Sequence, residues 1–256
     1  MNSIYETKIH SIQTDGRPGS WLKKRIDLKL INRILKCLQP LRANASIIHV
    51  LEVGTGSGRI AELLLDADTT ITYCGVEPVR TLREATIETM SRFAERSEIV
   101  DDSLPELQGI PSCEFDVCMM FHLLEHAPDH LHAHEWLKSI YEKIKPGGYV
   151  MILCPNIFDY KPYFYDADWS HGYPTTTKRI RDLGVDIGFE VVEALDLRCN
   201  SANVFVKTIL ACVSKLIPTG VVNKFGYLFC KIAYIGMGLQ ASMFWRNSWV
   251  VLKRDE

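Results

Sequence analysis

The most regular feature of the sequence is an alternation between short, almost continuously apolar runs and longer amphipathic segments. The apolar runs predict buried strands at residues 47–53, 69–77, 98–100, 115–121, 149–156, 189–198 and 248–254. The amphipathic segments carry apolar residues at helical spacing and predict helices at 21–41, 58–66, 79–93, 130–145 and 175–188. Because apolar strands alternating with amphipathic helices are typical of a parallel sheet covered on both faces, the pattern predicts an α/β fold.

Proline and glycine suggest where two of these elements end. Pro40 is expected to end the first helix, and the KPGG segment at 145–148 is expected to stop another helix and turn the chain back into the sheet. The chain contains no internal repeat or low-complexity linker. We therefore expect one elaborated domain with four parts: an N-terminal helical cap (1–45), a core (46–198), a helical insertion (199–244) and the final strand of the core sheet (245–256).

Composition narrows the class of protein. With 47% hydrophobic and 23% charged residues, the 256-residue chain has the balance of a soluble globular protein, and its net charge of −2 argues against a nucleic-acid partner. Eight cysteines without a CxxC pair fit a reducing, cytoplasmic compartment. The first ten residues lack the apolar run of a signal peptide, and no uncharged apolar run reaches the ~18 residues that a membrane-spanning helix needs.

The charge is unevenly distributed, because residues 197–254 contain eight Lys and Arg but no Asp or Glu. Within the expected insertion at 199–244, four lysines interrupt otherwise apolar sequence. Two helices closing a substrate pocket would explain this segment, and so would a subunit interface. The absence of acidic residues favours a third interpretation, an interfacial hairpin attracted to an anionic membrane surface. The sequence does not specify an oligomeric state.

Candidate chemistry begins with the segment LEVGTGSGRIAELL, in which three glycines separate a strand from a helix. Gly54, Gly56 and Gly58 let the backbone turn tightly and approach a ligand closely, and the helix that follows attracts negative charge at its N-terminus. The loop lacks the Lys-Ser/Thr pair of a phosphate-binding loop. Glu52 would repel a pyrophosphate and suits a cationic amino-acid group, whereas Glu77, at the end of the next strand, can accept both hydroxyls of a ribose.

Further motifs follow in order: VEP (76–78), DDSLPEL (101–107), FDVCMMFHLLEH (115–126) and IKPGGYVMILCPN (144–156). With the glycine loop, they make residues 45–196 resemble the class I S-adenosylmethionine-dependent methyltransferases. This resemblance implies a Rossmann-like, seven-stranded, mostly parallel sheet whose last strand is antiparallel. It also implies S-adenosylmethionine as the cofactor, bound by Glu52, Gly54, Thr55, Gly56, Gly58, Glu77, Pro78, Asp101, Asp102, Phe121 and His122. Of the two aspartates, one would contact the adenine amino group, and a solvated turn is the alternative for both.

Residues that could act on the methyl acceptor follow the fourth and fifth strands. His126, His171 and Glu125 are the candidate catalytic residues, because a histidine is the natural general base for a hydroxyl near pH 7. His122 is expected beside the cofactor, and His130 only begins the next helix.

A divalent metal is an alternative use of the same residues, since HxxEH together with His171 offers three imidazoles and a carboxylate. The pattern resembles the ExxEH of small-RNA 2′-O-methyltransferases and ubiquinone-pathway O-methyltransferases, but His122 stands where those families have Glu. The sequence therefore does not favour a metal and assigns no ligands. A metal site would also require His171 to meet the other three residues.

The segment DWSHGYP (168–174) and the basic apolar tail resemble bacterial methyltransferases that modify cell-surface glycans or their lipid-linked precursors. Five aromatic residues around this segment are candidates for stacking on a sugar, or for packing within their own loop: Tyr160, Tyr163, Tyr165, Trp169 and Tyr173. The leading hypothesis is a cytoplasmic enzyme, peripheral at the inner membrane face, that O-methylates a sugar hydroxyl in polysaccharide biosynthesis. A quinone-type or other small-molecule O-methyltransferase is the first alternative. A non-catalytic cofactor-binding or scaffold protein on the same fold is the second.

Overall fold

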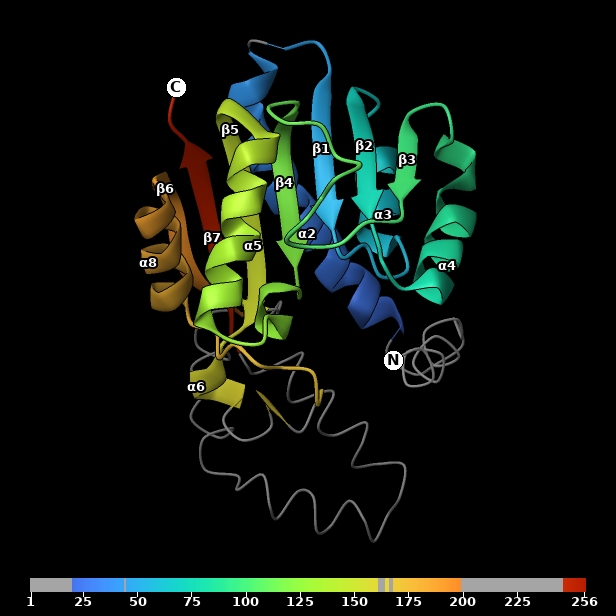
Figure 1. The fold of residues 1–256 in the computed structure, drawn as a ribbon. Coiled ribbons are helices and arrows are strands. Elements are labelled where there is room, and N and C mark those ends of the chain that lie inside the picture. The colour runs from blue at the N-terminus through green and yellow to red at the C-terminus, as the bar shows by residue number, and fades with distance from the viewer. Residues whose placement is uncertain (1–19, 44, 161–163, 166–167, 199–245) are drawn as a thin grey trace, which may run out of the picture.

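The structure, a computed structural model, describes residues 20–43, 45–160, 164–165, 168–198 and 246–256. Seven strands form one sheet in the order β3-β2-β1-β4-β5-β7-β6. They are β1 (Ile48–Val53), β2 (Ile71–Val76), β3 (Ser97–Val100), β4 (Phe115–Phe121), β5 (Ile144–Pro155), β6 (Phe189–Arg198) and β7 (Arg246–Arg254). The first five strands pair in parallel and β7 runs antiparallel to both of its neighbours, so the predicted fold class is confirmed (Figure 1).

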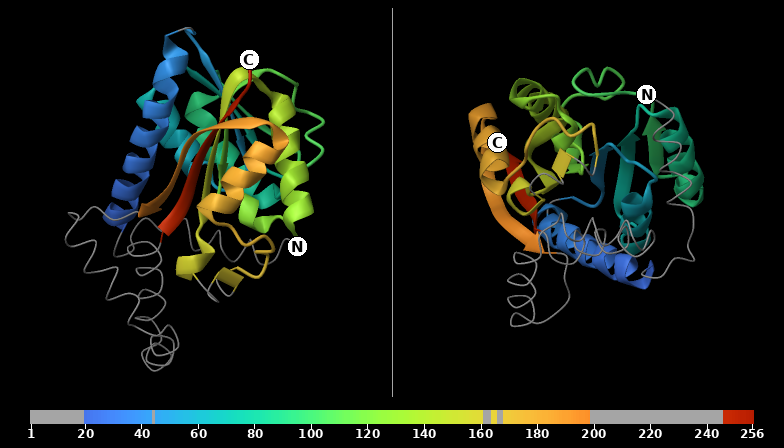
Figure 2. Two further views of the ribbon diagram at one scale, coloured as in Figure 1. Left: turned by 90° about the vertical axis from the view of Figure 1, so that its left-hand side faces the viewer. Right: turned by 90° about the horizontal axis from the view of Figure 1, so that it is seen from below.

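Helices cover both faces of the sheet, as Figure 2 shows in two turned views. The helices are α2 (Ser20–Arg42), α3 (Arg59–Ala67), α4 (Arg80–Met90), α5 (His130–Lys143), α6 (Ile157–Tyr160) and α8 (Thr177–Ile187), with short 3-10 turns η1 (Ser91–Phe93) and η2 (Leu124–His126). Successive side chains of a strand point to opposite faces, and β1 shows this directly. Leu51 and Val53 pack in the core beneath α5 and α8, whereas Ile48 and Val50 pack in the core beneath α2 and α3.

The first helix lies within one residue of its predicted bounds at each end, and α2 continues two residues past Pro40 to Arg42. A proline inside a helix cannot donate to the carbonyl four residues earlier, which here belongs to Lys36. Lys36 is exposed, so water can satisfy that carbonyl. The buried stripe of Ile31, Ile34 and Leu38 holds the last turn against the sheet.

The KPGG segment is not the predicted turn between helix and strand. α5 ends at Lys143 and β5 begins at Ile144, so KPGG lies inside the strand as a bulge. Phe115 pairs with Ile144 while Val117 already pairs with Tyr149, which leaves the segment between them as extra chain. The bulge depends on glycine because Gly147 has φ 76 and a Cβ on Gly148 would lie 2.9 Å from the Asp116 carbonyl oxygen.

The carboxyl ends of the parallel strands meet at one edge of the sheet. The arrowheads of β1, β2 and β4 point to the edge at which η2 and α6 lie, at the bottom of Figure 1. Open α/β sheets bind their ligands at this edge. The described residues that the sequence singles out for cofactor or acceptor lie on this edge or in the loops around it.

Among the described residues, no helix combines the length and the apolar character needed to cross a bilayer. The predicted insertion at 199–244 lies outside the described residues. The structure therefore does not test the three interpretations of this segment.

Candidate functional site

The glycine loop connects β1 to α3 with three left-handed residues. Gly54, Gly56 and Gly58 have φ values of 79, 59 and 73, where a side chain is strained. The Gly54 N–H donates to the Val76 carbonyl at 2.8 Å, which fixes the start of the loop to the end of β2. The sequence therefore needs glycine here for backbone conformation, whatever the ligand.

The three glycines differ in what surrounds them. A Cβ on Gly54 would come within 3.0 Å of the Leu123 side chain, and a Cβ on Gly58 within 3.0 Å of the Thr86 side chain. A Cβ on Gly56 would have no atom within 4 Å. The loop thus presents its bare backbone to open space at Gly56, as a site for a closely approaching cofactor requires.

Glu77 connects this open position to the end of β2. The buried carboxylate accepts the Gly56 N–H through Oε2 at 3.0 Å and the Val79 N–H through Oε1 at 3.1 Å. Burial raises the pKa of Glu77, although both backbone hydrogen bonds and the charge of Arg83 act in the opposite direction. Each oxygen keeps a second lone pair, so the carboxylate can still accept two ribose hydroxyls.

Glu52 lies buried on β1, where the Tyr73 hydroxyl donates to its Oε2 at 2.6 Å. Burial raises the pKa of Glu52 to about 7, which the Tyr73 hydrogen bond opposes and the charge of Glu77 reinforces. A buried carboxylate of this kind is stabilised by a cation placed beside it.

This raised pKa predicts a pH-dependent stability. Because the folded pKa of about 7 exceeds the ordinary 4.5, the folded protein retains a proton that the unfolded chain releases. The stabilisation is complete below about pH 4.5 and is lost as the pH rises through 7. Glu52→Gln, which is neutral at every pH, should remove on the order of 3 kcal/mol from the difference in unfolding free energy between pH 5 and pH 8. Urea denaturation measures this, with Glu88→Gln on the exposed face of α4 as the control. Equal pH slopes in wild type and Glu52→Gln would contradict the assignment.

Thr55 and Pro78 complete the predicted cofactor loops. The Thr55 hydroxyl lies 3.1 Å from the hydroxyl of Thr86, which itself donates to the Gly56 carbonyl at 2.8 Å. Pro78 is exposed at the end of β2. Sequence reasoning missed Thr86, since a single threonine inside an amphipathic helix carries no signal that it supports a loop.

Asp101 and Asp102 lie at the end of β3, and both already have partners. Asp101 is exposed and pairs with Arg83 through two contacts of 2.9 and 2.8 Å. Asp102 accepts the N–H groups of Ser103 and Gly109, each at 2.7 Å, and so closes the loop between them. Asp101 remains exposed to solvent although it pairs with Arg83. The carboxylate of Asp102 already accepts two backbone N–H groups and stabilises the loop between Ser103 and Gly109.

Phe121 ends β4 and His122 follows it, and the two side chains differ in burial. Phe121 is buried, with its ring centroid 6.0 Å from that of Trp249. His122 has φ 54, a strained value for a residue with a side chain, and its Nδ1 lies 3.4 Å from Oε1 of Glu125. The sequence separated His122 from Glu125 by role, whereas the structure pairs them.

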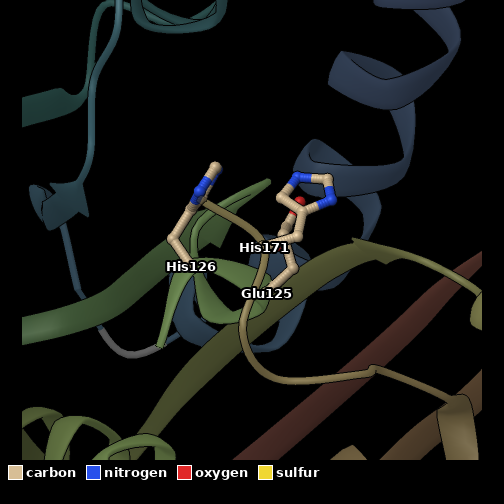
Figure 3. Close-up of side chains that lie close together, drawn as sticks. All are labelled: Glu125, His126 and His171. Atoms are coloured by element: carbon tan, nitrogen blue, oxygen red, sulfur yellow. The ribbon is translucent and has the colours of Figure 1, made fainter. Parts of the chain in front are cut away.

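The candidate catalytic residues come together. One potential donor atom from each of Glu125, His126 and His171 lies within 4.8 Å of the other two. Figure 3 shows Glu125 and His126 on one segment and His171 on the loop that crosses it. The crossing is held by two backbone hydrogen bonds, because Gly172 and Tyr173 donate their N–H groups to the Glu125 carbonyl at 3.0 and 3.2 Å. The imidazole centroids of His126 and His171 are 4.9 Å apart.

Glu125 is the buried member of this cluster, with 1% of its surface exposed. Burial alone would raise the pKa of Glu125, but the hydrogen bond from His122 and the electrostatic effects of the His122 and His126 rings outweigh burial and lower it. The nearby Cys154 stays a protonated thiol, since burial and the charge of Glu125 raise its pKa well above the usual range. The cluster therefore holds a buried negative charge between imidazoles.

The hydrogen bonds that orient the two candidate catalytic imidazoles were not predicted. The His126 Nδ1 lies 2.8 Å from the Ser170 hydroxyl, which donates to Asp168 at 2.7 Å. The His171 Nδ1 lies 2.5 Å from the Phe164 carbonyl oxygen. The DxxH motif contains Asp168 and Ser170, which form the chain of hydrogen bonds to His126. The contact between His171 and the Phe164 carbonyl depends on the shape of the loop and has no counterpart in the motif.

The aromatic residues of this loop divide into two groups. Tyr173 is buried, and the hydroxyl of Tyr160 donates to Asn247, so these two pack within the protein. Trp169 and Tyr165 precede His171 in the sequence and are 62% and 47% exposed. Tyr163 lies outside the described residues. Two exposed rings of this loop therefore flank Asp168 in the sequence, Tyr165 before it and Trp169 after it.

Comparisons with known proteins identify the family and agree with the fold. The sequence profile of a family described as "Methyltransferase domain" matches residues 22–194. No curated protein matches the sequence. A solved structure of a proposed sarcosine dimethylglycine methyltransferase from Galdieria sulphuraria superposes with TM-score 0.63 at 14% identity, over 89% of this chain and 86% of that one. N-methyltransferase NodS from Bradyrhizobium japonicum superposes with TM-score 0.58 at 11% identity, over 95% and 100% of the two chains. Phosphoethanolamine N-methyltransferase 2 from Haemonchus contortus, solved with S-adenosyl-L-methionine, superposes with TM-score 0.57 at 15% identity, over 94% and 59%.

Proposed function

The chain belongs to the methyltransferase domain family, and from that premise we propose that this S-adenosylmethionine-dependent enzyme methylates a sugar hydroxyl in a cell-surface glycan or its lipid-linked precursor. One observation carries the choice of acceptor. The loop that brings His171 to Glu125 and His126 also exposes the rings of Tyr165 and Trp169. Exposed aromatic rings beside groups that can engage a hydroxyl suit an acceptor with apolar C–H faces and polar edges.

We assign the cofactor to the part of the carboxyl edge of the sheet formed by the ends of β1, β2 and β3. The bare backbone at Gly56 receives the methionine portion, and Glu77 holds the ribose hydroxyls. We assign the α-amino group of the cofactor to the buried carboxylate of Glu52, and the adenine to the end of β3 at Asp101 and Asp102.

Methyl transfer from a sulfonium requires little of the protein beyond alignment. The acceptor oxygen must lie in line with the methyl group and must lose its proton. We assign this task to Glu125, His126 and His171, which meet at the carboxyl edge of the sheet that also carries the glycine loop.

The lipid-linked form of the acceptor rests on a separate argument. Residues 199–244 are basic and apolar without an acidic residue. Such a segment is suited to the surface of an anionic membrane, where lipid-linked sugars are found. The enzyme would then act as a peripheral protein on its substrate in the membrane.

The test is to follow a labelled methyl group. The full chain is incubated with methyl-labelled S-adenosylmethionine and with separate lipid, soluble-sugar and quinone pools. We expect label in the lipid or soluble-sugar pool, released by acid hydrolysis as an O-methylated monosaccharide. Label that enters only the quinone pool, or that resists hydrolysis of the glycan, would refute the proposal.

A variant sharpens this experiment. Trp169→Ala should raise the KM for the sugar acceptor about tenfold, or ~1.4 kcal/mol, without changing the affinity for S-adenosylmethionine. Leu131→Ala is the matched control, since Leu131 is equally exposed at 62% but lies on α5. An unchanged acceptor KM in Trp169→Ala would remove the aromatic loop from the acceptor site.

A further inference from the structure

The geometry points to a binding site for a divalent transition-metal ion formed by Glu125, His126 and His171. The sequence did not favour a metal and made one conditional on His171 reaching the other residues. The structure brings His171 to two of these residues, Glu125 and His126, and leaves His122 outside the cluster. The site itself is independent of the proposed function, and only the role given to the ion rests on it.

The donor atoms are close enough to share an ion. Two ligands that each lie ~2.1 Å from a metal are at most ~4.2 Å apart, and the three donors here lie within 4.8 Å of one another. Small rotations of the half-buried imidazoles close this difference. The backbone need not move, because the hydrogen bonds from Gly172 and Tyr173 to the Glu125 carbonyl already hold the two segments together.

Hydrogen bonds set the imidazoles in the tautomer that a metal requires. The Asp168 carboxylate only accepts, so the Ser170 hydroxyl donates to it and accepts from the His126 Nδ1–H. The Phe164 carbonyl also only accepts, so the His171 Nδ1 must carry a proton. Both rings therefore carry their lone pair on Nε2. Histidine ligands are commonly fixed in this way, with the second nitrogen donating to a carbonyl or to a carboxylate-linked group.

Glu125 supplies an independent observation. Its Oε2 is buried and has no N–H or O–H partner among the described residues, and only the weak thiol donor of Cys154 acts on the carboxylate beyond the imidazoles and backbone. An unpartnered, buried carboxylate oxygen is costly, and polar groups of this kind in a native structure call for a ligand. A cation bound to both Nε2 atoms would also satisfy this oxygen.

The donor set indicates the kind of metal. Two imidazoles and one carboxylate suit Mn²⁺, Fe²⁺, Co²⁺, Ni²⁺ or Zn²⁺, and leave coordination positions open for other ligands. On the proposed function, the ion would hold the acceptor hydroxyl and lower its pKa. The hydroxyl proton passes to solvent, the oxygen forms a bond to the methyl carbon, and the carbon–sulfur bond breaks. The electron pair returns to sulfur, and S-adenosylhomocysteine leaves without any change in oxidation state.

The experiment titrates Co²⁺ alone into the full chain, prepared without a histidine tag and stripped with chelator. We expect one equivalent to bind with the visible absorption of nitrogen and oxygen ligands and without thiolate charge-transfer bands. His171→Ala and Glu125→Gln should each weaken binding at least tenfold. His130→Ala, at the exposed start of α5, should bind as wild type does. His126→Ala provides a third test if either of the first two variants unfolds.

Binding in His171→Ala equal to that in wild type would overturn the site, as would a spectrum dominated by thiolate. Full methyl transfer in excess chelator would overturn the role assigned to the ion. Binding of S-adenosylmethionine, measured by calorimetry, separates the two proposals. A protein that binds both Co²⁺ and the cofactor but methylates no sugar would retain the metal site and lose the proposed acceptor.

Discussion

Replacing Gly56 with alanine is expected to weaken S-adenosylmethionine binding at least tenfold while costing the fold only about 1 to 2 kcal/mol. The cost to the fold comes from the backbone, because φ 59 at this position is left-handed. The new methyl group itself meets no atom of the protein within 4 Å. It occupies the open space against the loop that we assign to the cofactor, so the loss should appear in binding. Calorimetric titration with the cofactor and urea unfolding measure the two effects separately.

Gly147→Ala is the matched control for this substitution. Gly147 has φ 76, and its Cβ would approach nothing closer than the end of Glu256 at 3.9 Å, so it imposes the same kind of backbone strain in the bulge of β5. We expect it to lose similar stability and to bind the cofactor as wild type does. Equal cofactor affinity in Gly56→Ala and wild type would show that the cofactor does not approach this loop.

The apolar runs of the sequence predict the strands because burial on both faces leaves a strand little choice of residue. The boundary that was wrong, at KPGG, has a different origin, and the end of α2 two residues past Pro40 shows a related effect. Pro40 and KPGG signal a local break in hydrogen bonding, but whether a break ends an element depends on what packs against it. The buried stripe of Ile31, Ile34 and Leu38 carries α2 past Pro40. The pairing of Phe115 with Ile144 draws KPGG into the sheet as a bulge. Neither partner is visible in the local pattern.

In the candidate site, too, features that depend on neighbouring residues in the sequence could be predicted, and contacts that depend on an unusual backbone conformation could not. The left-handed glycines and the position of Glu77 follow from a strand, a turn and a helix in sequence order. The hydrogen bond from the Gly56 N–H to Glu77 joins this turn to the end of the next strand. His122 was assigned to the cofactor wall, apart from Glu125, because it directly follows Phe121. Its positive φ turns the side chain back toward Glu125, and a non-glycine residue gives no sign of such a conformation in the sequence.

The sequence placed His171 at the same edge of the sheet as Glu125 and His126, but it did not show which contacts bring the three residues together. Forty-four residues separate Ser170 from His126, and the contact between them depends on one loop passing across another. That crossing requires a glycine, since a Cβ on Gly172 would lie 2.6 Å from the carbonyl oxygens of both Ala127 and Pro128. The sequence shows the glycine but not the two carbonyl groups that make it necessary.

Gly172→Ala is therefore expected to reduce methyl transfer at least a hundredfold with little change in cofactor affinity. The clash is with backbone atoms, which cannot rotate away, so one of the two segments must move. Movement breaks the hydrogen bond from Gly172 to the Glu125 carbonyl and carries His171 away from Glu125 and His126. A misplacement of about 1 Å at reacting groups can cost ~100-fold in rate. The glycine loop at Gly56 lies after a different strand and should bind S-adenosylmethionine as before.

Gly184→Ala separates this effect from a general loss of packing. Its Cβ would also lie 2.6 Å from a neighbour, but that neighbour is the end of the Leu252 side chain between α8 and β7. We expect both variants to lose about 1 to 3 kcal/mol of unfolding free energy, with a hundredfold loss of kcat in Gly172→Ala alone. In the titration with Co²⁺, Gly172→Ala should also bind more weakly than Gly184→Ala, because only the former moves His171. If the two variants keep the same kcat, the meeting of His171 with Glu125 and His126 has no part in the reaction, and the acceptor must be engaged elsewhere on the edge of the sheet.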